Sequence, residues 1–99
     1  LRAAPWRAKP ELAATLVHPP SGRTMELLTT APGLQLYTSN FLDGSIRGKR
    51  DAAYDRYGGV CLETQNLPDA VNQAPRFPSA VLRPGEVYRH STIYRFSAQ

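Results

Sequence analysis

The alternation of apolar and polar positions predicts short strands along much of the chain. Residues 24–30 fit a strand, whereas residues 12–18, rich in alanine and leucine, fit either a strand or a short helix. Between these two runs, residues 19–22 (PPSG) carry a strong turn signal. Two runs joined by such a short loop are typical of a β-hairpin.

Two more strands are predicted in the middle of the chain, over residues 34–38 and 60–64. Successive side chains of a strand point to opposite faces. One face of each strand is therefore mostly apolar, and it is formed by Leu34, Leu36, Val60, Leu62 and Thr64. The other face is formed by Gln35, Tyr37, Cys61, Glu63 and Gln65. Each strand thus places one polar side chain, Gln35 or Glu63, in phase with bulkier neighbours.

The remaining segments are predicted to be loops, apart from one last strand. Residues 39–59 are polar and glycine-containing, and residues 66–81 are interrupted by prolines, so both should be long loops. Residues 83–86 (RPGE) place Pro and Gly at the central positions of a type II turn. Residues 87–96 then alternate β-branched and aromatic side chains, which predicts a strand. No helix is predicted, so the expected fold class is all-β, with antiparallel strands and long loops.

Composition limits the chain to one small globular domain. Hydrophobic residues make up 41% of the 99 residues and charged residues 20%, which is typical of a folded protein. A chain this short buries only part of its surface. It begins with Leu1 rather than Met, from which we expect a partial sequence.

The formal net charge of +4 raises the possibility of a nucleic-acid partner. The basic residues are dispersed, however, and the tight group Arg47, Lys49 and Arg50 lies beside acidic residues. No aromatic platform interleaves with them, as single-strand binding requires. We therefore expect a solvated loop here and no nucleic-acid partner. No apolar run approaches the length of a membrane span, so no membrane partner is expected either.

The cysteine and histidine residues indicate no metal site. Cys61 is the one cysteine, so no intramolecular disulfide can form, which fits a reducing compartment and a cytoplasmic location. His18 and His90 are far apart in sequence and have no Cys or His neighbours. His18 is expected at the surface, and His90, in phase with Tyr88 and Tyr94 on the last strand, is expected to pack.

Glu63 is the most unusual polar residue in the pattern, because glutamate is depleted in strands. The pattern alone favours a side chain on a solvated sheet face, and it favours the same for Gln35. Asp69 is expected to be a turn residue whose carboxylate accepts hydrogen bonds from backbone amides. Cys61 lacks a histidine near it in sequence, which argues against a thiolate nucleophile.

Several longer motifs carry a resemblance to a known family. Residues 29–42 (TTAPGLQLYTSNFL), residues 61–72 (CLETQNLPDAVN) and the ending with FPS at 77–79, LRPGE at 82–86 and YRF at 94–96 resemble the aldose 1-epimerase (galactose mutarotase) family. The match runs in order, with compatible spacing, from about residue 12 to residue 96. Such an ordered set of motifs is far more specific than one short pattern.

The resemblance implies that residues 1–99 form the C-terminal part of a galactose mutarotase-like β-supersandwich. Such enzymes interconvert the α and β anomers of aldohexoses such as galactose and glucose, without a cofactor or metal. The glutamate of the family's Leu-Glu-Thr-Gln motif is the general base, which corresponds to Glu63. The glutamine of its Pro-Gly-x-Gln motif contacts the sugar, which corresponds to Gln35.

One part of the family's machinery has no match in this chain. The family's general acid is a histidine from the N-terminal half, and neither His18 nor His90 fits its motif. We therefore expect the 99 residues alone to be inactive, since acid and base act together. Two alternatives remain open: a non-catalytic sugar-binding remnant that also uses Tyr37, and a structural piece. The latter would self-associate or assemble with a missing N-terminal segment through unpaired strand edges.

Overall fold

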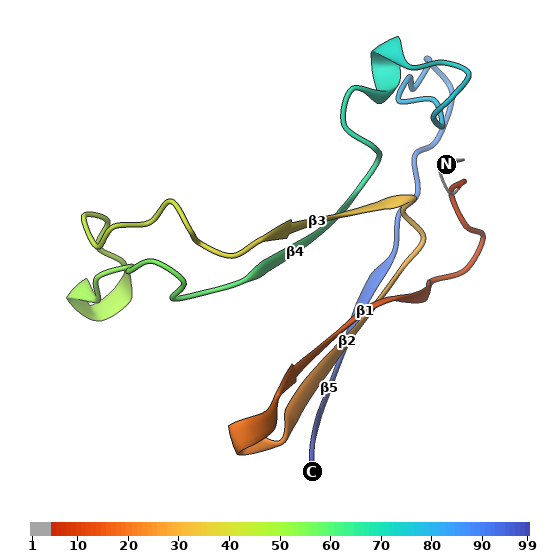
Figure 1. Ribbon diagram of the computed structural model, residues 1–99. Coiled ribbons are helices and arrows are strands. Elements are labelled where there is room, and N and C mark those ends of the chain that lie inside the picture. The colour runs from red at the N-terminus through yellow and green to blue at the C-terminus, as the bar shows by residue number, and fades with distance from the viewer. Residues whose placement is uncertain (1–4) are drawn as a thin grey trace.

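A computed structural model of the chain describes residues 5–99, which form five strands and three 3-10 turns (Figure 1). The elements are, in chain order, β1 Glu11–His18, η1 Pro19–Ser21, β2 Arg23–Thr29, β3 Gly33–Tyr37, η2 Lys49–Asp51, β4 Cys61–Gln65, η3 Ala70–Asn72 and β5 Thr92–Ala98. Every strand pair is antiparallel, and no α-helix occurs within residues 5–99. The all-β prediction is confirmed.

The predicted hairpin is formed by β1 and β2. The ambiguous run at 12–18 is a strand, because its two flanking prolines exclude a longer helix and β2 supplies a pairing partner. The turn ends at Gly22, which has φ of +66° and donates from its N–H to the Pro19 carbonyl at 3.3 Å. A Cβ at this position would collide with the Gln99 carbonyl oxygen, so the turn needs glycine for two reasons.

β2 is the central strand of a three-stranded sheet with the order β1-β2-β5. One face of this sheet is apolar, and the register places on it Leu16 of β1, Met25 and Leu27 of β2, and Tyr94 and Phe96 of β5. The other face carries an ion pair of 3.1 Å between Glu26 and Arg95. Leu27 is fully buried and is the centre of the small core.

β3 and β4 form a separate two-stranded ribbon, within one residue of the predicted strands 34–38 and 60–64. The loop 39–59 that joins them is held at its base by Ser39, whose hydroxyl donates to the Gly59 carbonyl at 2.9 Å. Ser39 has φ of +60°, in the left-handed region, and is 6% exposed. This buried serine turns the chain out of β3 and back toward β4.

The last strand begins later than predicted. The strand predicted over residues 87–96 is wrong for residues 87–91, because β5 starts at Thr92, opposite Thr29 at the end of β2. Thr30 still donates its N–H to the Ser91 carbonyl at 3.1 Å, but beyond it the chain turns toward β3 and residues 87–90 are not paired with β2. The Tyr88 and His90 side chains contact the Trp6 ring instead, with ring centroids 5.5 and 5.7 Å away.

The predicted type II turn before this segment is confirmed. Gly85 has φ of +85°, as the third position of that turn requires. The Glu86 N–H donates to the Arg83 carbonyl at 3.0 Å.

The sheet and the ribbon meet at a cluster of threonine hydroxyls and then diverge (Figure 1). The hydroxyls of Thr64 in β4 and Thr92 in β5 are 2.8 Å apart. His90 Nε2 lies 3.2 Å from the Thr29 hydroxyl, 3.3 Å from that of Thr64 and 3.1 Å from that of Thr92. We call these four residues the threonine junction. They connect β4 to the sheet that contains the core.

Candidate active site

Gln35 and Glu63 lie directly opposite each other in the β3–β4 ribbon. Opposed residues of an antiparallel pair share a face, with Cβ atoms about 4.5–5.5 Å apart. On the same face, the next pair toward the loop is Tyr37 with Cys61, and the next pair away from the loop is Gly33 with Gln65. The sequence predicted the face of each strand separately, and the structure brings the two predicted site residues together on one face.

Beside the Gln35–Glu63 pair, Gly33 allows β3 to approach Gln65 and Leu67 closely. A Cβ on Gly33 would lie 3.1 Å from the Leu67 Cδ2 atom and 3.2 Å from the Gln65 carbonyl oxygen. These distances are shorter than ordinary van der Waals contacts. The Pro-Gly-x-Gln sequence therefore has a local structural meaning, because its glycine sets the approach of the strand that carries Gln35.

Glu63 and Gln35 are both exposed. Glu63 is not a member of any of the three ion pairs formed within residues 5–99. A carboxylate offers hydrogen-bond acceptors, and a carboxamide offers both donors and acceptors. The pair can therefore hold adjacent hydroxyl groups of one polyhydroxylated ligand, with the carboxylate positioned to accept a proton.

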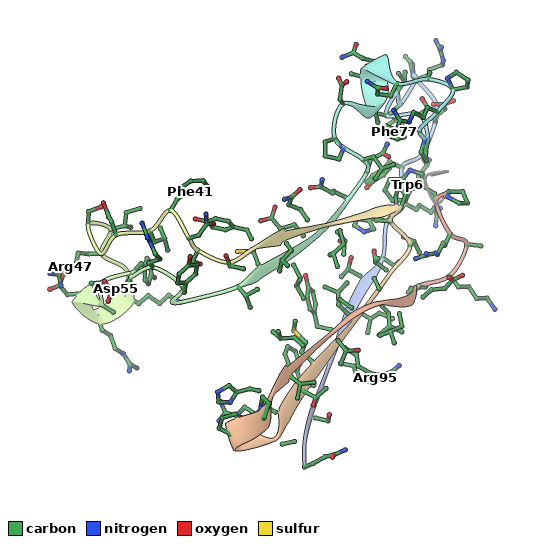
Figure 2. The ribbon with its side chains drawn as sticks, viewed as in Figure 1. Trp6, Phe41, Arg47, Asp55, Phe77 and Arg95 are labelled. Atoms are coloured by element: carbon green, nitrogen blue, oxygen red, sulfur yellow. The ribbon has the colours of Figure 1, made fainter. Side chains whose placement is uncertain are left out.

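Two aromatic rings extend the same strand end. Tyr37 and Phe41 are stacked, with ring centroids 6.4 Å apart and an interplanar angle of 19°. Phe41 is 84% exposed, and Figure 2 shows it on the segment that leaves β3. Phe41 is a candidate that the sequence pattern missed. The stacking depends on the left-handed turn at Ser39, which strand periodicity does not reveal.

His90 lies on the opposite side of the ribbon from the carboxylate of Glu63. Its Nε2 contacts the Thr64 hydroxyl, and neighbouring side chains of a strand point to opposite faces. The expected packing role is confirmed by its contact with Trp6, although His90 precedes β5 and is not on a strand as predicted. No sequence signal marked the threonine junction, because its members come from three separate segments.

His18 lies at the far end of the β1–β2 hairpin and is exposed, as expected. Its Nδ1 is 2.8 Å from the Ser21 hydroxyl oxygen. Cys61 is free and exposed, across the ribbon from Tyr37. Neither His18 nor His90 lies beside the Glu63 carboxylate in this structure.

Asp69 is a turn residue, as predicted, but its hydrogen-bond donors differ from the prediction. Its carboxylate accepts hydrogen bonds from the side-chain amides of Gln73 at 2.8 Å and Asn72 at 2.6 Å, rather than from backbone amides. The left-handed backbone at Asp69, with φ of +61°, directs the side chain over the following turn. These donors, that of Gln73 first, hold the pKa of Asp69 below its usual value.

The basic group of the 39–59 loop is solvated, as predicted. Arg47, Lys49 and Arg50 are exposed, and Arg47 pairs with Asp51 at 3.5 Å. Figure 2 shows Arg47 at the end of the loop that is remote from the threonine junction. Between residues 5 and 99, no three His, Cys, Asp or Glu side chains are grouped to hold a metal ion. No helix in this part of the chain is long and apolar enough to cross a membrane.

Comparison with known proteins decides the family. The profile of the family described as Aldose 1-epimerase matches residues 4–95. The chain belongs to the aldose 1-epimerase family. Its antiparallel strands are accordingly part of the family's β-supersandwich, as the resemblance implied.

Individual relatives agree with this membership. The chain is 58% identical over 84 residues to galactose mutarotase from Homo sapiens and 55% identical over 87 residues to that from Mus musculus. Aldose 1-epimerase from Escherichia coli (strain K12) is 42% identical over 78 residues. These matches cover 85%, 88% and 76% of this chain, but only 24%, 25% and 22% of the respective relatives. The chain thus spans about a quarter of the length of the relatives that it matches.

Proposed function

We propose that this chain is the C-terminal part of an aldose 1-epimerase, in which Glu63 is the general base and Gln35 holds the sugar. The observation that carries the proposal is the cross-strand pairing of these two residues on the exposed face of the ribbon. Two motifs separated by a long loop thus supply one carboxylate and one carboxamide to the same ligand-sized area. The substrate class is a free aldohexose, in keeping with the names of the mammalian and bacterial relatives.

The proposed reaction moves two protons and breaks one bond. Glu63 takes the proton of the C1 hydroxyl while a general acid delivers a proton to the ring oxygen, and the C1–O5 bond breaks to give the open-chain aldehyde. Rotation about the C1–C2 bond exposes the other face of the carbonyl. The O5 hydroxyl then attacks C1 and returns its proton to the conjugate base of the acid. The carbonyl oxygen on C1 recovers the proton from Glu63 and becomes the C1 hydroxyl of the other anomer.

Gln35 and the aromatic residues have a positioning role in this proposal. A carboxamide can donate to one sugar hydroxyl and accept from the next, which fixes the ring relative to the opposing carboxylate. Tyr37 is next on the same face of β3 and presents an apolar ring with a hydroxyl tip. Together they keep C1 within reach of Glu63.

The 99 residues by themselves are proposed to be inactive. The general acid has to approach the ring oxygen beside Glu63, whereas His90 lies on the other side of the ribbon and His18 at the distant hairpin turn. The acid therefore comes from another part of the complete domain. Loss of a general acid or base slows such a reaction by about a hundred- to ten-thousandfold.

Polarimetry of freshly dissolved α-galactose tests the base assignment in the complete protein. Glu63→Gln keeps the size and hydrogen-bonding shape of the side chain but removes the base, so we expect kcat to fall about a hundred- to ten-thousandfold. Glu26→Gln, at the carboxylate paired with Arg95 in the other sheet, is the control and should retain the parent rate. An unchanged rate for Glu63→Gln shows that Glu63 is not the base.

A second function is favoured by one specific observation: the Gln35–Glu63 pair is present without an acid beside it. The chain could hold a sugar without turning it over. Titration of galactose against the 99 residues, followed by NMR shifts of residues in β3 and β4, tests this function. Binding at millimolar sugar that Gln35→Ala weakens supports it, whereas an unchanged spectrum excludes it.

We further propose a cytoplasmic location and a reaction independent of metals and cofactors. The lone exposed thiol, Cys61, is suited to a reducing compartment. Cell fractionation tests the location, and recovery in a membrane or secreted fraction contradicts it. Full activity of the complete protein after exhaustive dialysis against a chelator is the expected result for the chemistry.

A further inference from the structure

β4 is held to the three-stranded sheet through one side chain, that of Thr64. Within residues 5–99, the β4 side chains form hydrogen bonds to the sheet and the segment before β5 only at the Thr64 hydroxyl, which lies 2.8 Å from that of Thr92 and 3.3 Å from His90 Nε2. β3, by contrast, is joined to β2 covalently through residues 30–32. The position of β4 relative to the sheet therefore depends on the threonine junction.

The segment that carries His90 is itself fixed to the sheet. The Ser91 N–H donates to the Thr30 hydroxyl at 3.1 Å, and the Ser91 carbonyl accepts the Thr30 N–H at 3.1 Å. The imidazole ring packs edge-on against Trp6, with centroids 5.7 Å apart and planes at 78°. Figure 2 shows Trp6 beside the point where the ribbon and the sheet meet. Both the backbone and the ring orientation of His90 are thus set by contacts outside the ribbon.

Thr29 does not need the ring nitrogen as a hydrogen-bond acceptor. Its hydroxyl oxygen accepts the Ala31 N–H at 3.1 Å, and its hydroxyl hydrogen can be donated to the Ser91 carbonyl at 3.3 Å. Thr29 is 1% exposed, so these two partners satisfy it without water. The ring nitrogen of His90 is therefore available to the other two threonines of the junction.

Thr64 and Thr92 together leave one hydroxyl hydrogen for His90. Their hydroxyls share one hydrogen bond, in which only one of the two hydrogens is used. For the other hydrogen, His90 Nε2 lies 3.1 Å from the Thr92 hydroxyl and is a nearer acceptor than the Thr29 hydroxyl, at 3.4 Å. We therefore assign the neutral ring with its hydrogen on Nδ1, so that Nε2 accepts. This assignment links Thr64 through Thr92 to the ring.

We propose that His90 is a positioning residue for the general base, because it is the acceptor that fixes Thr64 and, with it, the β4 backbone at Glu63. The inference rests on the proposed function, in which Glu63 takes the proton of the C1 hydroxyl. Thr64 directly follows Glu63 in β4, so a shift of the Thr64 side chain moves the neighbouring carboxylate. A displacement of about 1 Å at a reacting group can cost about a hundredfold in rate. His90 lies on the other side of the ribbon and does not contact the sugar itself.

Packing against Trp6 is the alternative role for the ring, and it needs no ring nitrogen. Two substitutions separate the two roles. His90→Phe keeps an aromatic ring beside Trp6 but removes the acceptor. His90→Gln removes the ring, but its side-chain amide supplies an oxygen acceptor at a similar distance from the backbone. The order of their effects therefore shows which property of His90 matters.

The experiment measures mutarotation of α-galactose by the complete protein. We expect His90→Phe to lower kcat about ten- to a hundredfold and to leave KM nearly unchanged, because Gln35 lies on β3, which stays joined to β2. His90→Gln should retain most of the parent kcat. His18→Phe, the same substitution at the distant hairpin turn, is the matched control and should retain the parent kcat.

A second variant keeps the test decisive when a substitution at His90 impairs folding. Thr64→Val breaks the same link from the ribbon and leaves the Trp6 contact untouched, so it should lower kcat to a similar extent. The double variant with His90→Phe should be no slower than the slower single variant, because both changes break one chain of hydrogen bonds. Urea unfolding of each variant shows whether a lower kcat reflects less folded protein.

Three results overturn the proposal: a parent-like kcat for His90→Phe, a loss for His90→Gln as large as that for His90→Phe, or independent losses that multiply in the double variant. In the Glu63→Gln background, His90→Phe should cause little further loss, because the group that it positions is gone. A normal rate for Glu63→Gln contradicts the proposed function itself. A slow Glu63→Gln together with a parent-like His90→Phe overturns this inference alone.

Discussion

The three-stranded sheet and the β3–β4 ribbon are built from similar residues but differ in how much each is supported. In the sheet, β2 is flanked on both sides, and Leu27 is fully buried between its neighbours. In the ribbon each strand has one partner, and none of its side chains is fully buried. Two-stranded ribbons are marginally stable alone. The sheet thus provides the stability of this chain, and the ribbon provides the proposed chemistry.

This difference has a functional meaning. In the proposed function, Gln35 and Glu63 must keep a fixed geometry to position a sugar, yet they lie on the less supported element. The threonine junction attaches one end of the ribbon to the sheet. Each of the following changes tests one side of the contrast between sheet and ribbon.

Leu27→Ala should have the largest effect on stability. It removes the one leucine that is fully buried within residues 5–99, so the free energy of unfolding of the chain should fall by about 2–5 kcal/mol. Leu36→Ala, at a side chain 58% exposed, should cost less than about 1 kcal/mol. Urea unfolding followed by circular dichroism measures both. Equal losses of stability in the two variants would show that sheet and ribbon are equally supported.

Gly33→Ala should destabilise the ribbon by about 1–3 kcal/mol, because the new methyl group meets the Leu67 side chain and the Gln65 carbonyl. The control is Gly59→Ala, whose Cβ would meet the Ser39 hydroxyl at an ordinary 3.5 Å. Amide hydrogen exchange across β3 and β4 reports the change locally. A larger effect of the control variant would contradict the close approach described at Gly33.

Thr64→Val should loosen the connection between ribbon and sheet. It keeps the shape of the side chain but removes the hydroxyl that lies 2.8 Å from that of Thr92, at a cost of about 1 kcal/mol. A double-mutant cycle with Thr92→Val isolates the interaction between the two hydroxyls. Thr15→Val, at an exposed hydroxyl on the other face of the sheet, is the control. Zero coupling energy would show that the junction does not join the two regions.

Asp69 should give the smallest effect, confined to acid. Its pKa is lowered in the folded chain, chiefly by the Gln73 amide and then by that of Asn72. Its contribution to stability is therefore present above the usual pKa of 3.8 and is lost as pH falls through the lowered value. In Gln73→Ala the pKa of Asp69 should rise toward its usual value, as an NMR titration of the carboxyl carbon would show. A value unchanged by the substitution contradicts the assigned cause.

Most strands could be predicted because their signals are local. The hairpin of β1 and β2 follows from the Pro-Pro-Ser-Gly turn, and the faces of β3 and β4 follow from two-residue periodicity. The predicted start of the last strand was wrong. The alternation at Tyr88 and His90 is compatible with a strand, but a strand also needs a neighbouring strand to pair with, and alternation does not supply one. Those rings pack with Trp6, which is more than eighty positions away in sequence.

The sequence by itself determined the strand-forming segments, the turn glycines and the motifs that identify Gln35 and Glu63 as site candidates. These depend on local backbone preferences and on residue identity. Only the tertiary structure decided that the two residues are opposed in register and that Thr29, Thr64 and Thr92 meet around His90. The register and the threonine junction depend on contacts between segments far apart in the chain, where periodicity within one segment carries no information about the partner.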